Sequence, residues 1–119
     1  MLEVELKFKE LIELLCNIIQ QRRVIQFYYE SARRKEERII RPYHMLPRGK
    51  NIELVGIPIE ELSKPLQARQ PGHYTLSQLL LRIENKQCKI LAETFNDPGV
   101  PRNIVDSSKI ESYLQIYLR

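Results

Sequence analysis

The spacing of apolar residues changes at Arg23 from a helical period to an extended one, and this change constrains the fold more than any other feature of the chain. Between Lys7 and Gln21, apolar residues recur three or four positions apart, which is typical of an amphipathic helix. From 24 to 30 they recur at every second position, which is typical of a strand with one buried face. The sequence therefore predicts a helix over 7–21 whose apolar stripe packs against a following sheet or against a second copy of the chain.

Four further stretches predict strands, and a long connection divides them into two groups. Apolar, β-branched or aromatic residues between turn-forming ones mark 37–46, 51–57, 74–84 and 87–93. Pro42 has no backbone donor, so the second strand is expected to lie at an edge or to bulge there. The connection over 58–72 contains three prolines and one expected helical turn at 59–63. Connections of this length in small domains are usually functional or mobile.

The predicted order of elements is one helix, five strands and a final helix. The final helix is expected over 105–118, where Asp106 or Ser107 can serve as the N-cap. Five short antiparallel strands are too few for a sandwich and favour a small, strongly bent sheet or barrel, here over about 24–93. A length of 119 residues suffices for one domain with a real core, so a single domain over 1–119 is expected.

Positive charge is concentrated between Arg22 and Lys50. This segment holds nine Lys or Arg residues and three Glu residues, so its net charge is +6 although the whole chain carries +4. Aromatic residues at 27–29 and 43 lie among these arginines, and on a sheet such groups together bind phosphates and stack bases of single-stranded nucleic acid. The segment therefore predicts a surface for a polyanion. The alternative interpretation is a solvated, arginine-rich turn.

The sequence contains no motif for catalysis, for a metal or for a cofactor. His44 and His73 have no metal-binding neighbour at helical spacing, and no serine elbow or glycine-rich phosphate loop is present. Cys16 and Cys88 lack metal-ligand spacing and fit a reduced setting. A signal peptide and an uncharged apolar run long enough to cross a bilayer are also missing. We therefore expect a non-enzymatic, cytoplasmic protein without a metal or cofactor.

Taken in order, four stretches of the sequence resemble the WYL domain family. In this family a basic pair leads into a strand that ends in aromatic residues. It is followed by an Arg-x-Val-x-Pro strand, then by a Trp-Tyr-Leu strand, and later by an apolar segment that ends in Arg-Ile. The matching stretches are 22–29 (Arg-Arg-Val-Ile-Gln-Phe-Tyr-Tyr), 38–42 (Arg-Ile-Ile-Arg-Pro), 52–56 (Ile-Glu-Leu-Val-Gly) and 80–83 (Leu-Leu-Arg-Ile). The chain departs from the pattern at Ile52 and Glu53, which stand for Trp and Tyr, and at Leu81, where an acid is usual.

The resemblance implies an SH3-like or Sm-like five-stranded β-barrel, so the fold is expected to be mainly β with an N-terminal and a C-terminal flanking helix. It also implies a ligand-sensing module in transcriptional or CRISPR-associated regulation, which binds nucleic acid or a nucleotide, with single strands favoured. It places ligand binding at Tyr29, Arg38, Arg41, His44 and Arg82, and the basic segment adds Arg48.

Two other functions stay open at this point. The helix over 7–21, with Leu2, Val4 and Leu6 before it, also fits a protein-interaction or dimerisation module that has no nucleic-acid ligand of its own. An enzyme acting on a phosphorylated substrate is the least favoured alternative. The expected partners are nucleic acid or a nucleotide, a second copy in a homodimer, and a separate effector or DNA-binding protein, but no membrane.

Overall fold

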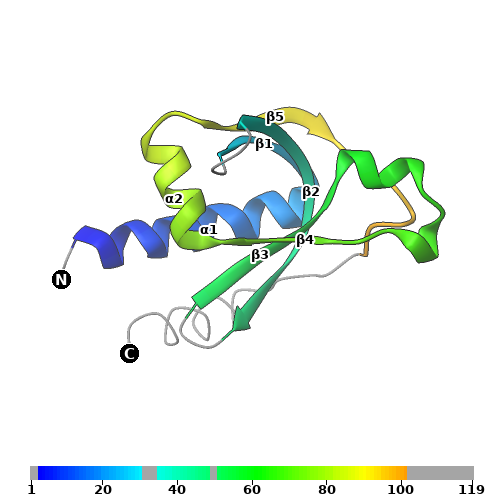
Figure 1. Cartoon of the computed structure of the whole chain (residues 1–119). Helices are drawn as coiled ribbons and strands as arrows, with labels where there is room; N and C mark the ends of the chain where they lie inside the picture. Colours follow the sequence, from blue (N-terminus) through cyan, green and yellow to red (C-terminus); the bar gives the residue numbers. More distant parts are fainter. Residues whose placement is uncertain (1–2, 31–34, 49–50, 102–119) are drawn as a thin grey trace.

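A computed structural model of the chain describes the backbone of residues 3–30, 35–48 and 51–101, and the side chains of 7–28, 37–48 and 51–101. The predicted hairpin tip at 31–34 and the predicted C-terminal helix over 105–118 lie outside the described residues. Two helices and a five-stranded sheet make up the described part, and α1 and α2 lie on the same side of the sheet (Figure 1). We call this side of the sheet the helix face, and the opposite side the outer face.

Helix α1 spans Glu3–Gln21, which confirms the predicted helix and extends it toward the N-terminus. Its stripe is buried as the spacing predicts, because Leu11, Ile12, Leu15, Ile18 and Ile19 are each at most 3% exposed. The helix ends at Gln21, and the next residue, Arg22, has a φ of 52°, which places it in the left-handed region. A residue there turns the chain out of the helix and directly into the first strand.

The sheet is entirely antiparallel, with the strand order β4-β3-β2-β1-β5. Its strands are β1 (Arg23–Glu30), β2 (Lys35–Arg48), β3 (Asn51–Pro58), β4 (Gly72–Thr75) and β5 (Cys88–Thr94). The register of β2 against β3 shifts between Pro42 and His44, as expected from the missing proline donor. Within the described residues β4 and β5 do not pair with each other, so the sheet is open and a closed SH3-like or Sm-like barrel is not confirmed.

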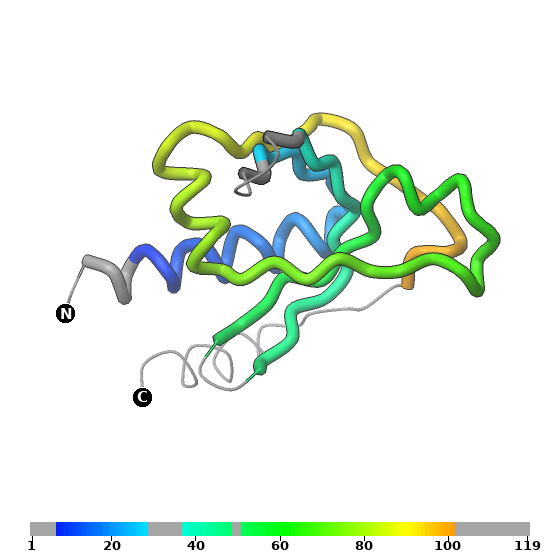
Figure 2. The backbone as a smooth tube through the Cα atoms, viewed as in Figure 1, coloured from blue at the N-terminus to red at the C-terminus, as the bar shows by residue number. Residues whose placement is uncertain are grey.

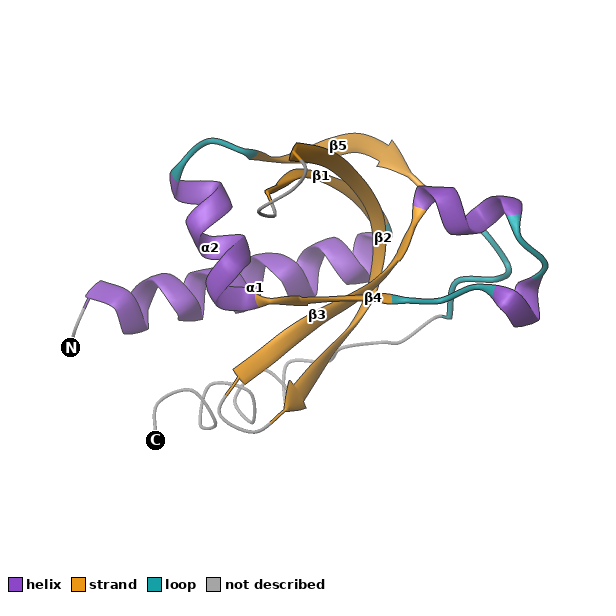
Figure 3. Ribbon diagram, in the orientation of Figure 1, coloured by secondary structure: helices purple, strands orange, loops and turns teal. Residues whose placement is uncertain are grey.

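The prediction of a strand over 74–84 was wrong for most of its length. Only Tyr74 and Thr75 belong to β4, and Leu76–Glu84 forms helix α2 (Figure 3). The side-chain oxygen of Thr75 accepts a hydrogen bond from the backbone N–H of Gln78 at 3.3 Å and caps this helix. Leu76 and Leu79, three positions apart, are its buried residues. A short apolar run fits a buried strand and a short helix equally well, and here the cap decides between them.

Two groups of apolar side chains stabilise the fold, one on each face of the sheet. The larger one joins α1 and α2 to the helix face and includes Ile12, Ile40 and Leu54, which are all 0% exposed. The smaller one lies on the outer face and contains Val24, Ile57, Phe95 and Val100. We call it the outer cluster. Its last two members come from the segment over 95–101, which crosses the outer face after β5.

The long connection after β3 contains two short 3-10 helices, η1 (Ile59–Ser63) and η2 (Leu66–Ala68), and the first confirms the expected helical turn. The segment over 95–101 runs beside this connection (Figure 2). Gly99 lies at that crossing, where a Cβ would meet the ends of the Leu66 and Arg69 side chains and these would have to move. Among the described residues, no helix is both long enough and apolar enough to span a membrane.

Candidate ligand-binding groove

Strand register brings an arginine and an aromatic residue together at one end of the helix face. Arg38 of β2 pairs with Phe27 of β1, and directly opposed residues of an antiparallel pair point to the same side. Phe27 is buried in the larger core, so Arg38 also lies on the helix face. The Phe27 ring meets the Tyr74 ring of β4 edge to face, with centroids 5.0 Å apart. These two rings form an aromatic floor beneath the arginine end of the sheet.

Helix α2 adds a second arginine to the same place. Gln78 and Arg82 are one helical turn apart on α2 and therefore lie on the same side of it. Together with Phe27, Tyr74 and Leu79 they line a small cavity. The cap at Thr75 sets where this helix begins, and so it also sets where Arg82 points.

A larger open groove of about 660 Å³ shares Tyr74 and Gln78 with that cavity. Its wall includes Arg38, Lys64 and His73, and also Glu60 and Glu61 from η1. We call these two adjoining hollows together the ligand groove. They are lined by Phe27, Arg38, Pro58, Glu60, Glu61, Lys64, Gln70, Pro71, Gly72, His73, Tyr74, Gln78, Leu79 and Arg82.

Acidic residues accompany the cations of the ligand groove. Arg38 forms an ion pair with Glu60 across 2.7 Å, and Lys64 forms one with Glu61 across 2.5 Å. The Arg38 side chain is 31% exposed and that of Glu60 is 53% exposed, so solvent reaches this pair. Exposed pairs of this kind contribute little stability, and an incoming anion can therefore displace Glu60 at small cost.

The predicted binding residues divide between the two faces of the sheet. Arg38 and Arg82, which are far apart in the sequence, line adjoining hollows of the ligand groove that share Tyr74 and Gln78. Tyr29 lies two positions after Phe27 on β1 and pairs with Glu36. Its side chain lies outside the described part. Arg48, at the end of β2, is 67% exposed and pairs with Glu53 across 3.3 Å.

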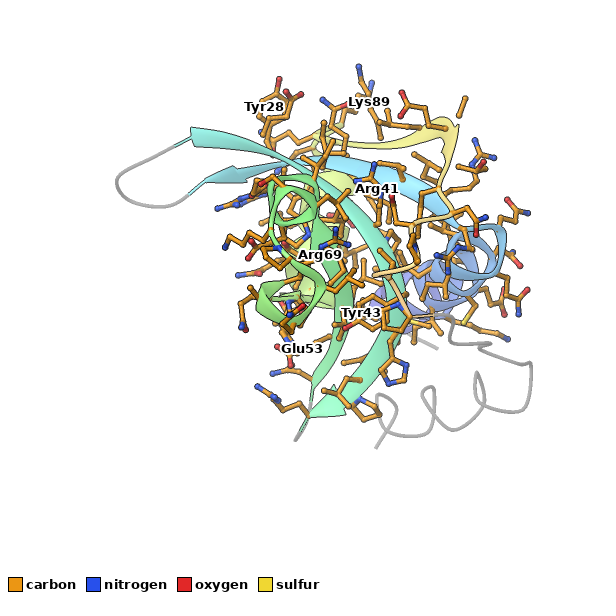
Figure 4. All side chains as sticks on the ribbon, turned by 90° about the vertical axis from the view of Figure 1, so that its right-hand side faces the viewer. Tyr28, Arg41, Tyr43, Glu53, Arg69 and Lys89 are labelled. Atoms are coloured by element: carbon orange, nitrogen blue, oxygen red, sulfur yellow. The ribbon has the colours of Figure 1, made fainter. Side chains whose placement is uncertain are left out.

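Arg41 and His44 lie on the outer face, away from the ligand groove. Met45 is buried in the larger core, so its neighbour His44 points to the other side of β2. Arg41 forms an ion pair with Asp97 across 2.9 Å, and only 15% of its side chain is exposed. Figure 4 shows Arg41, Tyr43 and Arg69 on this side of the molecule. The outer arginine thus serves a contact within the chain.

The basic pair at the start of β1 is also used within the chain. The Arg22 guanidinium donates hydrogen bonds to the carbonyl oxygens of Phe95 at 3.1 Å and Val100 at 3.4 Å, and it lies 4.5 Å from the centre of the Phe95 ring. Arg23 donates two hydrogen bonds to the carbonyl oxygen of Leu91, at 3.2 and 3.1 Å. Three of the nine cations of the basic segment, Arg22, Arg23 and Arg41, therefore hold β5 or the segment over 95–101.

Sequence reasoning missed Tyr74, Gln78 and Glu60 as parts of the groove. Tyr74 and Gln78 were placed in one predicted strand, in which the helical neighbourhood of Gln78 and Arg82 does not exist. The order Thr75-Leu76-Ser77-Gln78 is a capping-box pattern, a threonine with a glutamine three positions later, and it would have predicted the start of α2.

Comparison with known proteins agrees with the resemblance read from the sequence. The sequence pattern of the WYL domain matches residues 10–61. Over these residues the chain is similar to the WYL domain family. The matched part covers most of α1, all of β1, β2 and β3, and the first half of η1. Arg38 and Glu60 lie inside it, whereas Tyr74 and Arg82 lie beyond it.

A search of the curated proteins finds no match to this chain. A search of solved structures finds similarity to proteasome accessory factor B/C (PafBC) of Arthrobacter aurescens, with 16% sequence identity and a TM-score of 0.49. The similarity covers 82% of this chain and 13% of the PafBC chain.

Cys16 and Cys88 are both free thiols, and both are shielded from ionisation. Burial raises the pKa of Cys88 to about 11, and burial together with the nearby Glu13 carboxylate raises the pKa of Cys16 to about 11. Neither thiol is therefore a thiolate at neutral pH, which is the form that attacks electrophiles and binds metals. In the described residues no three His, Cys, Asp or Glu side chains are grouped as metal ligands.

We expect both thiols of the folded chain to react slowly with a disulfide reagent at about pH 8. After unfolding, both should react at the rate of a free thiol. Because the folded pKa of about 11 exceeds the unfolded value of 9.0, the thiols stabilise the fold below pH 9.0, and this contribution is lost as the pH rises toward 11. Rates measured on Cys16→Ser and Cys88→Ser would assign each thiol. Equal rates in folded and unfolded chains would contradict the burial that raises these pKa values.

Proposed function

We propose that this chain is a ligand-sensing regulatory module without catalytic activity, which binds nucleic acid or a nucleotide in the ligand groove. The observation that carries the proposal is that Arg38 and Arg82 line two adjoining hollows that share Tyr74. Guanidinium groups bind phosphate, often with two parallel hydrogen bonds, and aromatic rings stack on bases. Two cations beside a partly exposed ring therefore suit a ligand that has both a phosphate and a base.

The size of the ligand groove favours a small ligand or a single strand over a duplex. A volume of about 660 Å³ lies in the range of small-molecule sites, and the groove is bounded by η1, β4 and α2. A rigid double helix reaches such a hollow only with its backbone, whereas a nucleotide or an unpaired base can enter it. This supports a nucleotide or a short single-stranded segment as the ligand.

Glu60 supports a gating role at the same site. Its carboxylate holds Arg38 across 2.7 Å, so a phosphate that binds Arg38 takes the place of Glu60. The ligand then frees η1 from β2 at one point of the long connection. A change of this kind, in which a ligand replaces an internal ion pair, is a simple way to couple binding to a structural response. We place this response in transcriptional or CRISPR-associated regulation, through a separate effector or DNA-binding protein.

Binding of fluorescently labelled single-stranded DNA, single-stranded RNA and mononucleotides tests the proposal. We expect Arg38→Ala and Arg82→Ala each to weaken binding by about tenfold, and Glu60→Gln to strengthen it by about threefold, because charge-assisted contacts to phosphate are of this magnitude. Binding of the strands should weaken steadily as salt increases, since phosphate contacts release counterions.

Arg48→Ala is the matched control for the two arginine variants. Arg48 belongs to the same basic segment, is 67% exposed and does not line the ligand groove. It should leave affinity nearly unchanged. If Arg48→Ala weakens binding as much as Arg38→Ala does, the chain attracts anions by its overall charge, and the groove is not the site. An affinity that does not depend on salt rejects nucleic acid as the ligand.

A second function, as a dimerisation module, is favoured by an apolar hollow beside strand β5. It lies where α1, α2 and β5 meet, has a volume of about 130 Å³, and is lined by Leu14, Leu15, Ile18, Ile25, Leu79, Ile83, Cys88 and Ile90. Leu14, Ile83 and Ile90 on its rim are 39, 37 and 39% exposed. Apolar side chains grouped at the surface are typical of a contact with another protein.

A further inference from the structure

Strand β5 is an edge of the sheet, and most of its side chains are in solvent. It pairs with β1 on one side, and among the described residues no strand pairs with its other side. Five of its seven residues are exposed. An edge strand has a row of backbone donors and acceptors that another strand can bind, and natural proteins usually protect such an edge. β5 has no proline, and its length of seven residues is sufficient for pairing.

The hydrogen bonds at the two ends of β5 show which residues direct their backbone groups to the open side. The carbonyl oxygen of Gln87 accepts from Tyr28, and the N–H of Phe95 donates to Arg22. Odd-numbered residues therefore direct their backbone groups toward β1. Backbone direction alternates along a strand, so the even-numbered residues 88, 90, 92 and 94 direct theirs to the open edge.

The inner side of β5 is satisfied even where its pairing is irregular. The register against β1 shifts between Arg23 and Ile25. At this point Arg23 donates to the carbonyl oxygen of Leu91 and replaces the missing backbone partner. The strand is thus held to the sheet at both ends and in its middle, which leaves a fixed open edge.

Opposite charges occur at two positions of β5 that are symmetric about Leu91. Lys89 and Glu93 are both exposed, and Leu91 between them packs against the outer cluster, so all three lie on the outer face. Lys89 and Tyr28 lie at the same end of the molecule (Figure 4). In the described part of the chain, neither Lys89 nor Glu93 takes part in an ion pair. The two charges are about 13 Å apart along the strand, too far to pair with each other.

We propose that two copies of the chain join through antiparallel pairing of their β5 strands about a twofold axis at Leu91. In this register Lys89 of each copy lies opposite Glu93 of the other, which gives two equivalent ion pairs. Residues 90 and 92 then face each other, as do 88 and 94, and these are the residues whose backbone groups reach the open edge. Lys89 and Glu93 form a pair without backbone hydrogen bonds, in which side chains approach most closely.

Charge complementarity selects this register, and it identifies a second copy of the chain as the partner of β5. Shifting the pairing by two residues in either direction keeps the backbone match but separates Lys89 from Glu93. An isologous contact needs a surface that is complementary to itself, and a lysine and a glutamate placed symmetrically about the axis meet this need. The proposal does not rest on the ligand groove, because no residue of β5 is among those that line it, so the two can succeed or fail separately.

The apolar hollow described above extends the same contact on the helix face. Ile90 belongs to β5 and to the rim of the hollow, and it faces Ala92 of the second copy in this register. The rim residues Leu14 and Ile83 then approach the joined edge from both copies. A strand pair alone gives a small contact, and the adjoining apolar rims add the buried area that a stable dimer needs.

Sedimentation velocity over a range of concentrations tests the dimer. The unmodified chain should be a dimer. Lys89→Glu and Glu93→Lys should each raise the dissociation constant of the dimer by about tenfold, because each variant creates two like-charge pairs in a symmetric contact. The double variant Lys89→Glu with Glu93→Lys restores opposite charges in both pairs, so it should dimerise like the unmodified chain. Ala92→Pro removes an outward-facing N–H without disturbing β1, and it should give monomers.

Lys9→Glu is the control, because Lys9 is an exposed residue of α1 and the charge change is the same. It should leave the dimer intact. A chain that is monomeric at every concentration overturns the proposal, as does a dimer that withstands both Ala92→Pro and the single reversals. A dimer that Lys9→Glu weakens as much as Lys89→Glu assigns the contact to α1. A larger closed assembly indicates pairing of unlike edges and also overturns the twofold contact.

Discussion

Leu54→Ala should lower the free energy of unfolding by about 3 to 4 kcal/mol, because it removes a fully buried side chain from the centre of the larger core. Leu54 is 0% exposed and belongs to β3, where it pairs with Met45 on one side and Tyr74 on the other. Both strands are fixed by their own hydrogen bonds, so the site can close only partly around the cavity. Chemical denaturation monitored by circular dichroism gives the free energy directly.

Leu81→Ala provides the same chemical change at an exposed position. Leu81 is 51% exposed on α2, and removal of its side chain should change the free energy of unfolding by less than about 0.5 kcal/mol. Similar losses for the two variants would contradict the packing around Leu54. The test bears on function as well, because a shift of Tyr74 would change the floor of the ligand groove.

Arg22→Ala should lower the free energy of unfolding by about 2 to 3 kcal/mol, since it removes hydrogen bonds from a charged donor and a contact with an aromatic ring. Arg22 bonds the carbonyl oxygens of Phe95 and Val100, and its guanidinium lies 4.5 Å from the Phe95 ring centre. Alanine is also unfavourable at a φ of 52°. The same denaturation experiment measures the loss.

Two further variants separate these causes. Arg22→Gly removes the guanidinium, but glycine adopts the left-handed backbone conformation without strain. The difference in free energy of unfolding between the Gly and Ala variants therefore reports the backbone cost. A double-mutant cycle with Phe95→Leu should show a coupling of about 0.5 to 1 kcal/mol between ring and guanidinium. Independent, additive losses would mean that the two groups do not stabilise each other.

Periodic signals predicted the part of the fold in which one face of each element is buried. The stripe of α1 and the alternation in β1 were sufficient, because an element with a single buried face repeats its apolar residues at a fixed spacing. Pro42 predicted the register shift in β2 through its missing donor. The family resemblance, carried mostly by β1 and β2, is confirmed by the match over 10–61.

Elements decided by local capping, and contacts between distant segments, were not predicted. The run over 79–81 has no clear period, so the start of α2 depended on the Thr75 cap. The path of the segment over 95–101 brings Asp97 to Arg41 and Phe95 to Arg22, and no local pattern encodes this path. The family resemblance placed Arg41 at the binding surface beside Arg38. Alternation, however, places residues three apart on opposite faces of a strand.

The opposite placement of Arg38 and Arg41 on β2 has a consequence for signalling. One strand holds Glu60 through its helix-face arginine and Asp97 through its outer-face arginine. A ligand that shifted β2 at Arg38 would therefore also move Arg41, three residues along the strand, and with it the ion pair to Asp97. The segment over 95–101 would then respond to the groove across the thickness of a single sheet, without the movement of a whole domain.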